Sequence, residues 1–204
     1  MQGSKFVIAV SALIFAVAGF GDEATAGQPL HVVTAGASAE LVFDETFPPA
    51  YVSAGCRDEL PRGGLTCEAN IYMQQSPSGW TSGEAVIDAS QFPIDDSLDV
   101  ASLTATIDGM TCDYLFSPPC APITIGVHAQ WTAVDRPINS SMGRAKQEDN
   151  DPPDCHVTVV GHSIRRDAVA SGTITIQSFQ FRSVGSSLAG LERTSHPHSD
   201  GTYC

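Results

Sequence analysis

The sequence is poor in cationic side chains. Of its 204 residues, 10 are Lys or Arg and 23 are Asp or Glu, which gives a formal net charge of −13 at pH 7. A chain with this balance repels polyanions, so binding to nucleic acid or to an anionic membrane surface is not expected. The same charge also suits an ordinary secreted protein that is kept soluble by self-repulsion.

Long hydrophobic runs are scarce as well. The single example extends from Phe6 to about Phe20, directly after Lys5, and is shorter than the roughly 20 apolar residues that span a bilayer. We therefore expect residues 1–26 to be a secretory signal peptide cleaved after "ATA", although the acidic pair at 22–23 leaves a cut nearer Gly19 open. Cleavage after Ala26 removes one cation and two acids, so the mature chain carries a charge of −12.

Nothing in the rest of the sequence predicts an anchor. No cysteine follows the apolar run closely, and no second apolar segment is present. The mature chain is expected to be secreted, either extracellular or, in a Gram-negative bacterium, periplasmic.

Motifs of several catalytic classes are missing. The nucleophile elbow needs Gly-x-Ser-x-Gly, and the nearest strings, "GHSIR" at 161–165 and "GSSLA" at 185–189, lack the final glycine. Aromatic residues make up 7% of the chain, so no aromatic-rich groove for carbohydrate is evident. Serine, histidine and aspartate sites on β folds carry no local motif, and that class stays open.

Cysteines are present in an even number, which favours disulfides in an exported chain. Paired Cys-x-x-Cys spacings, which a zinc site would need, are absent. Short loops close easily, which favours Cys56–Cys67 and Cys112–Cys120 and leaves Cys155–Cys204 as the third of three predicted disulfides. The full set is Cys56, Cys67, Cys112, Cys120, Cys155 and Cys204.

The hydrophobic pattern alternates with a period of two, as in half-buried strands. In 65–74, Leu65, Cys67, Ala69, Ile71 and Met73 share one face, while Tyr72 belongs to the opposite face. In 123–134, the alternation places Trp131 in the core and His128 outside. In 171–183, the apolar, inward-facing positions are even-numbered up to Ile176 and odd-numbered from Phe179. One extra residue near Gln177 or Ser178 would account for the switch, so a β-bulge is predicted there.

Many short strands joined by polar turns predict an all-β fold. We expect a disulfide-stapled antiparallel β-sandwich, jelly-roll or immunoglobulin-like, with a closed β-barrel as the alternative. The expected organisation is a single β domain over residues 27–183. A loosely packed Gly- and Ser-rich tail, residues 184–204, follows it and is tied back by Cys204.

Two local features are candidate binding sites. The acidic segment "EDNDPPDCH" offers Asp149, Asn150, Asp151 and Asp154 as oxygen ligands for calcium, although the EF-hand spacing is not met and an exposed loop is the simpler interpretation. Trp80, in the expected turn "SPSGWTSG", is a candidate stacking platform for a partner, or else a residue that caps the edge of the core.

The sequence therefore indicates a non-catalytic secreted β domain that binds an extracellular protein or glycan, or has a structural role. No cofactor is expected apart from the calcium candidate. One alternative is a secreted hydrolase whose acids, or Ser and His, converge only in space. Another is a protease inhibitor that acts through a rigid loop.

Overall fold

The computed structural model describes residues 30–44, 47–60, 63–75, 79–114, 117–146 and 158–198. These residues form a nearly all-β structure, and the described part contains a short 3-10 helix, η1 (Ala89–Gln91), but no α-helix. The strands are β1 (Leu30–Val42), β2 (Ala50–Leu60), β3 (Thr66–Gln75), β4 (Gly79–Ile87), β5 (Val100–Tyr114), β6 (Ser117–Ala133), β7 (Ile138–Lys146), β8 (Thr158–Ile176), β9 (Phe179–Arg182) and β10 (Gly185–His198).

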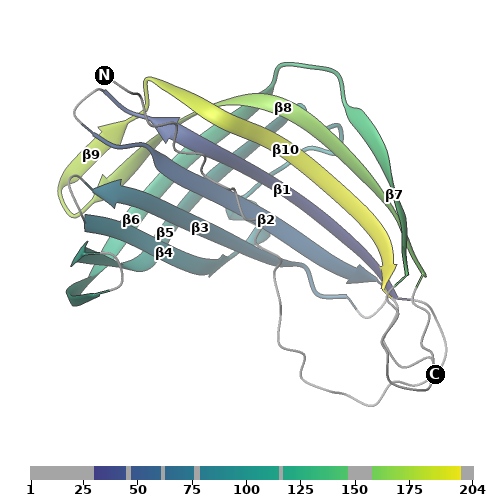
Figure 1. Cartoon of the computed structure of the whole chain (residues 1–204), viewed down its shortest axis with the longest axis horizontal. Coiled ribbons are helices and arrows are strands. Elements are labelled where there is room, and N and C mark those ends of the chain that lie inside the picture. Colours follow the sequence, from purple (N-terminus) through teal and green to yellow (C-terminus); the bar gives the residue numbers. More distant parts are fainter. Residues whose placement is uncertain are drawn as a thin grey trace, which may run out of the picture.

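Each strand from β1 to β5 pairs in antiparallel fashion with the next one along the chain. Strand β8 is long enough to pair with β7 through its first half and with β6 through its second half. The second half of β8 also pairs with β9. Figure 1 shows β1, β2, β3 and β10 crossing the front of the molecule, with β5 and β6 behind them.

The last strand, β10, pairs with the first strand, β1, and also with β8. It pairs with β1 along most of that strand, from Leu30 with His198 to Val42 with Gly185, and with β8 from Gly190 to Ser195. The expectation of a loosely packed tail after Ser183 was therefore wrong for residues 185–198. Pairing with two distant strands, which local composition does not encode, orders this Gly- and Ser-rich segment.

Alternation places the apolar residues on one face of the sheet, as the sequence predicted. Trp131 is fully buried and His128 is exposed, and both predictions are confirmed. Leu65 differs from its prediction because it precedes β3 and is 56% exposed. The buried face is built mainly from small and branched aliphatic side chains, among them Ala39, Leu41, Val52, Ala69, Ile71, Leu103, Ile107, Ile125, Ala129 and Ile174.

The connection between β4 and β5, residues 88–99, contributes large side chains to this core. Phe92 and Leu98 are both almost fully buried. Leu98 adopts a left-handed conformation with φ 58°, which is unfavourable for leucine but compensated by its complete burial. Two arginines, Arg193 of β10 and Arg166 of β8, hold the same segment: Arg193 donates to the Asp96 carboxylate at 2.8 Å, and Arg166 forms an ion pair with Asp99.

The switch from even-numbered to odd-numbered apolar positions after Ile176 is caused by a turn and not by a bulge. Gln177 and Ser178 form a turn, with Gln177 at φ 55°, and Ile176 pairs directly with Phe179 across it. The bulge prediction was therefore wrong, since a tight turn and a bulge both shift the alternation by one position.

Two of the predicted disulfides are present, Cys56–Cys67 between β2 and β3 and Cys112–Cys120 between β5 and β6. The third predicted pair, Cys155–Cys204, lies outside the described residues. No helix in the described residues is long and apolar enough to cross a membrane.

Candidate functional site

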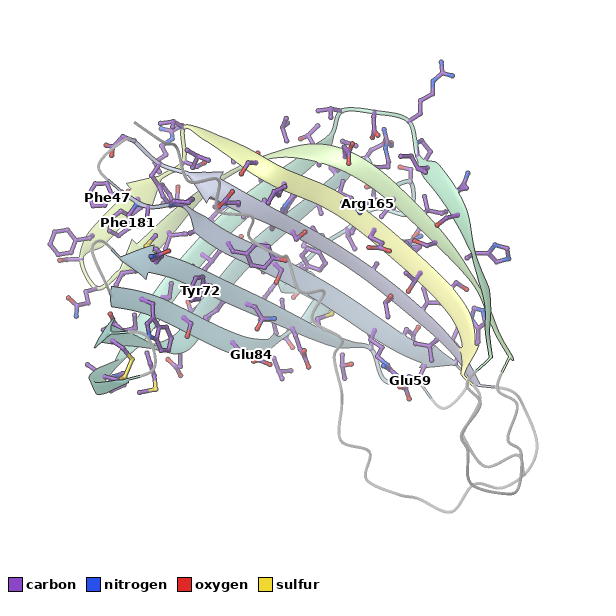
Figure 2. The ribbon with its side chains drawn as sticks, viewed as in Figure 1. Phe47, Glu59, Tyr72, Glu84, Arg165 and Phe181 are labelled. Carbon is purple, nitrogen blue, oxygen red and sulfur yellow. A yellow bond between two sulfur atoms is a disulfide. The ribbon has the colours of Figure 1, made fainter. Side chains whose placement is uncertain are left out.

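Aromatic side chains gather on the outer face of β2, β3 and β4. Tyr51 of β2 pairs in register with Tyr72 of β3, and these two side chains are 44% and 39% exposed. Trp80 of β4 lies beside Tyr72, with ring centroids 6.5 Å apart and planes inclined by 21°. We refer to Tyr51, Tyr72 and Trp80 as the aromatic strip, and Figure 2 labels Tyr72 at its middle.

The alternation of the strands explains why these rings point outward. Val52, Ile71 and Thr81, which neighbour the three aromatics in sequence, are buried on the core face. Successive side chains on a strand point to opposite faces, so each aromatic neighbour must face away from the core. The strip therefore lies on the face opposite the core, with Tyr51 and Tyr72 exposed and Trp80 half-buried.

The surroundings of Trp80 are covalently and sterically fixed. Trp80 pairs in register with Cys112, whose disulfide to Cys120 joins β5 to β6. Close to it, β4 and β5 approach tightly at Gly83 and Gly109, where a Cβ on Gly109 would lie 2.3 Å from the Ser82 carbonyl oxygen. Glycine is thus required where β4 and β5 approach each other, and the aromatic strip lies on a restrained part of the sheet.

Polar side chains surround the strip on the same face. Glu40 pairs with Tyr51 and accepts a hydrogen bond from the Ser187 hydroxyl, while Ser82 pairs with Tyr72. Gln74 pairs directly with Trp80, and Asn70 and Glu84 form the next pair on this face beyond Tyr72 and Ser82. The result is an apolar, ring-bearing centre with carboxylate, amide and hydroxyl groups at its edges.

An open concavity of about 690 Å³ lies farther around the outer face, over β5, β6 and β8. Its lining includes Asp108, Pro122, Thr124, Gly126 and Thr175. Pro122 pairs with Met110, and Met110 pairs with Ser82, so a row of paired residues leads from the strip to the concavity. Hydroxyl and carboxylate groups dominate its polar lining.

A second group of reactive residue types meets on the other face of the sheet. The Ser195 hydroxyl and Nε2 of His31 share a hydrogen bond of 2.9 Å, across 164 positions of sequence. Ser195 of β10 pairs with Val33 of β1 on one side and with His162 of β8 on the other. Val33 pairs in turn with Asp58 of β2. Among the described residues, no carboxylate is hydrogen-bonded to His31, so a complete triad is not formed there.

The predicted site residues have different outcomes. Trp80 lies in strand β4 rather than in a turn, so the turn assignment was wrong, while its proposed role in partner binding stays a prediction. The calcium candidates Asp149, Asn150, Asp151 and Asp154 lie outside the described residues. Within the described ranges, no group of three or more His, Cys, Asp or Glu side chains is placed to hold a metal ion.

Sequence reasoning did not single out Tyr51 or the strip as a whole. A low aromatic content argued against a carbohydrate surface, but composition cannot reveal that three aromatics fall on adjacent strands. The alternation of 65–74 did place Tyr72 on the face opposite the core, which was the available signal.

Comparisons with known proteins give no relative. No protein-family model matches the chain, and neither a curated protein nor a solved structure is significantly similar to it. Any function must therefore be argued from the residues themselves.

Proposed function

We propose that this protein is a secreted, non-catalytic β domain that binds an extended glycan on the aromatic strip. The observation that carries the proposal is the near-parallel arrangement of the exposed Tyr72 ring and the half-buried Trp80 ring beside Tyr51, on one restrained face. Aromatic faces bury the apolar faces of ligand rings, and nearby polar groups bind hydroxyls and fix orientation.

The spacing of the strip also favours a polymer over a compact ligand. Neighbouring strands are about 4.8 Å apart, a separation comparable with the length of one sugar unit in a β-linked chain. Tyr51 and Tyr72 occupy paired positions on adjacent strands, so consecutive sugar units of a chain running across the strands would meet successive aromatic side chains. Exported proteins meet such polymers outside the cell, and the two disulfides are typical of an oxidising compartment.

We further infer that the sheet forms the closed β-barrel that the sequence offered as the alternative to a sandwich. The support is the double pairing of β10, with β1 on one side and β8 on the other, which returns the series of pairings to its first strand. A two-sheet sandwich would leave unpaired edges between its layers. Closure would present the strip on a convex outer surface.

The test is binding to insoluble and soluble β-linked polysaccharides, followed by titration calorimetry on the best ligand. Tyr72→Ala should weaken binding at least about fivefold, because truncating a central aromatic contact costs more than about 1 kcal/mol. Phe179→Ala is the matched control, since this aromatic on β9 is 66% exposed and far from the strip in strand order. Equal affinity of Tyr72→Ala and wild type, or no binding to any glycan, would remove the proposal.

A second candidate function rests on the hydrogen bond between Ser195 and His31. A nucleophile and a base within hydrogen-bonding reach are the minimum constellation of a serine hydrolase. It is the weaker candidate because no carboxylate among the described residues is hydrogen-bonded to His31, and labelling of Ser195 with a fluorophosphonate probe tests it.

A further inference from the structure

We propose that the aromatic strip prefers cationic amino-sugar polymers, such as deacetylated β-linked glucosamine chains, over neutral or anionic glycans. This inference rests on the proposed glycan-binding function and adds the charge of the ligand. It is carried by the carboxylates that share the outer face with the rings.

The carboxylates stand at defined positions around the rings. Glu40 is the direct cross-strand partner of Tyr51, on the side of the strip formed by β1. Glu84 is exposed and lies on β4, two residue pairs along the strands from the pair that joins Ser82 to Tyr72. Figure 2 shows Tyr72 and Glu84 on neighbouring strands of the front surface.

Compensating cations are scarce in this part of the chain. Residues 30–114 contain only Arg57 and Arg62 as Lys or Arg. Arg57 is already paired, with its guanidinium 2.6 Å from the Glu59 carboxylate. The field over β1 to β5 is therefore negative, which attracts a polycation and repels uronate or sulfated glycans.

The geometry suits an amino sugar in particular. A pyranose ring can stack on an aromatic side chain while its ammonium group reaches a carboxylate at the edge of the strip. The cation also gains from lying close to an electron-rich aromatic face. An N-acetylated or purely hydroxylated sugar can still stack on the aromatic side chain. It has no ammonium group to pair with the carboxylate or to lie against the aromatic face.

The experiment compares three β-1,4-linked oligosaccharides of equal length that differ at the C2 substituent: hydroxyl, N-acetylamino and ammonium. Affinities are measured with the full mature chain by titration calorimetry, at mildly acidic pH where the amine of the sugar is protonated. We expect the ammonium form to bind roughly threefold to tenfold more tightly, because each exposed ion pair strengthens binding by only a few-fold. Added salt should reduce this preference.

Charge variants separate this inference from the function on which it rests. Glu40→Gln combined with Glu84→Gln should abolish the preference and leave the affinity for the neutral oligosaccharides unchanged. Asp167→Asn is the control, since this exposed carboxylate lies on β8, which is not a neighbour of β2, β3 or β4 in the sheet.

Each other result overturns a stated part of the argument. Equal binding of the three oligosaccharides, with loss of binding in Tyr72→Ala, would reject the charge preference and keep the glycan site. No binding of any oligosaccharide would reject both. A lysine oligomer that binds as tightly as the glucosamine chain, with the same dependence on Tyr72, would assign the strip to basic peptides instead.

Discussion

Phe92 meets Trp131 edge to face in the core, with ring centroids 6.4 Å apart and planes at 88°. Trp131 belongs to β6, whereas Phe92 comes from the connection between β4 and β5, so this contact joins a connecting segment to the sheet. Both residues are at most 1% exposed. The connection from residue 88 to residue 99 is therefore part of the hydrophobic core.

Phe92→Ala should lower the free energy of unfolding by about 3 to 5 kcal/mol, because it removes buried apolar surface and leaves a cavity beside Trp131. Urea denaturation followed by tryptophan fluorescence measures the change. Val86→Ala provides the comparison, since Val86 is 80% exposed and should cost less than about 0.5 kcal/mol. Similar urea midpoints for the two variants would contradict the assignment of Phe92 to the core.

The Arg166 side chain, which is 13% exposed, links the same segment to the connection between β6 and β7 by polar contacts. Its Nε donates to the Asp135 carbonyl oxygen at 3.1 Å, and it pairs with the Asp99 carboxylate. Arg166→Met should destabilise the fold by about 2 to 3 kcal/mol, because it leaves these acceptors without their donor. Asp96→Asn should change stability by less than about 0.5 kcal/mol, since Asp96 is 97% exposed in its own ion pair. Equal urea sensitivity of the two variants would show that Arg166 contributes no more than a surface pair.

The local features of this fold were readable from the sequence because their causes are local. Period-two alternation located the buried face of β6 and the outward position of Tyr72, since side-chain direction depends only on position along the strand. Short loop closure identified Cys56–Cys67 and Cys112–Cys120. Both signals are local: alternation involves adjacent residues, and the two disulfides close separations of 11 and 8 residues.

Long-range pairing was not readable in the same way. Residues 185–198 looked like a tail because Gly and Ser favour loops, yet β1 and β8 order them as a strand. Trp80 looked like a turn residue because Ser and Pro precede it, although β4 already begins at Gly79. The aromatic strip depends on how β2, β3 and β4 are paired, which a pattern within one strand cannot specify.

The Ser195–His31 pair supplies a direct test of catalysis. Because no carboxylate among the described residues is hydrogen-bonded to His31, we expect weak activation of the hydroxyl. A fluorophosphonate probe should therefore label wild type no faster than Ser195→Ala, as measured by mass spectrometry of the intact protein. In a true hydrolase, the Ser195 oxygen would bond to phosphorus, fluoride would leave and the proton would pass to His31. Labelling that is lost in Ser195→Ala and slowed in His31→Gln would establish the hydrolase and reject the non-catalytic proposal.

Asp95 links the connecting segment to acid stability. Burial is the largest influence on its carboxyl and acts to raise the pKa. Hydrogen bonds from the Ser97 hydroxyl and from backbone N–H groups, including that of Val100 at 2.8 Å, together outweigh burial and hold the pKa below the ordinary value of 3.8. In the unfolded chain these bonds are lost, so the unfolded state binds the proton more readily.

The sign of the pH dependence follows from this difference. The stabilisation by Asp95 is fully present above the pKa of the unfolded state and is lost as the pH falls through the lower pKa of the folded state. Asp95→Asn should therefore reduce the free energy of unfolding near neutral pH and flatten its decline below about pH 4. Urea titrations at a series of acidic pH values measure both effects, with Asp96→Asn as the control for the loss of one charge. Curves for wild type and Asp95→Asn that stay parallel throughout the acid range would contradict a lowered pKa at Asp95.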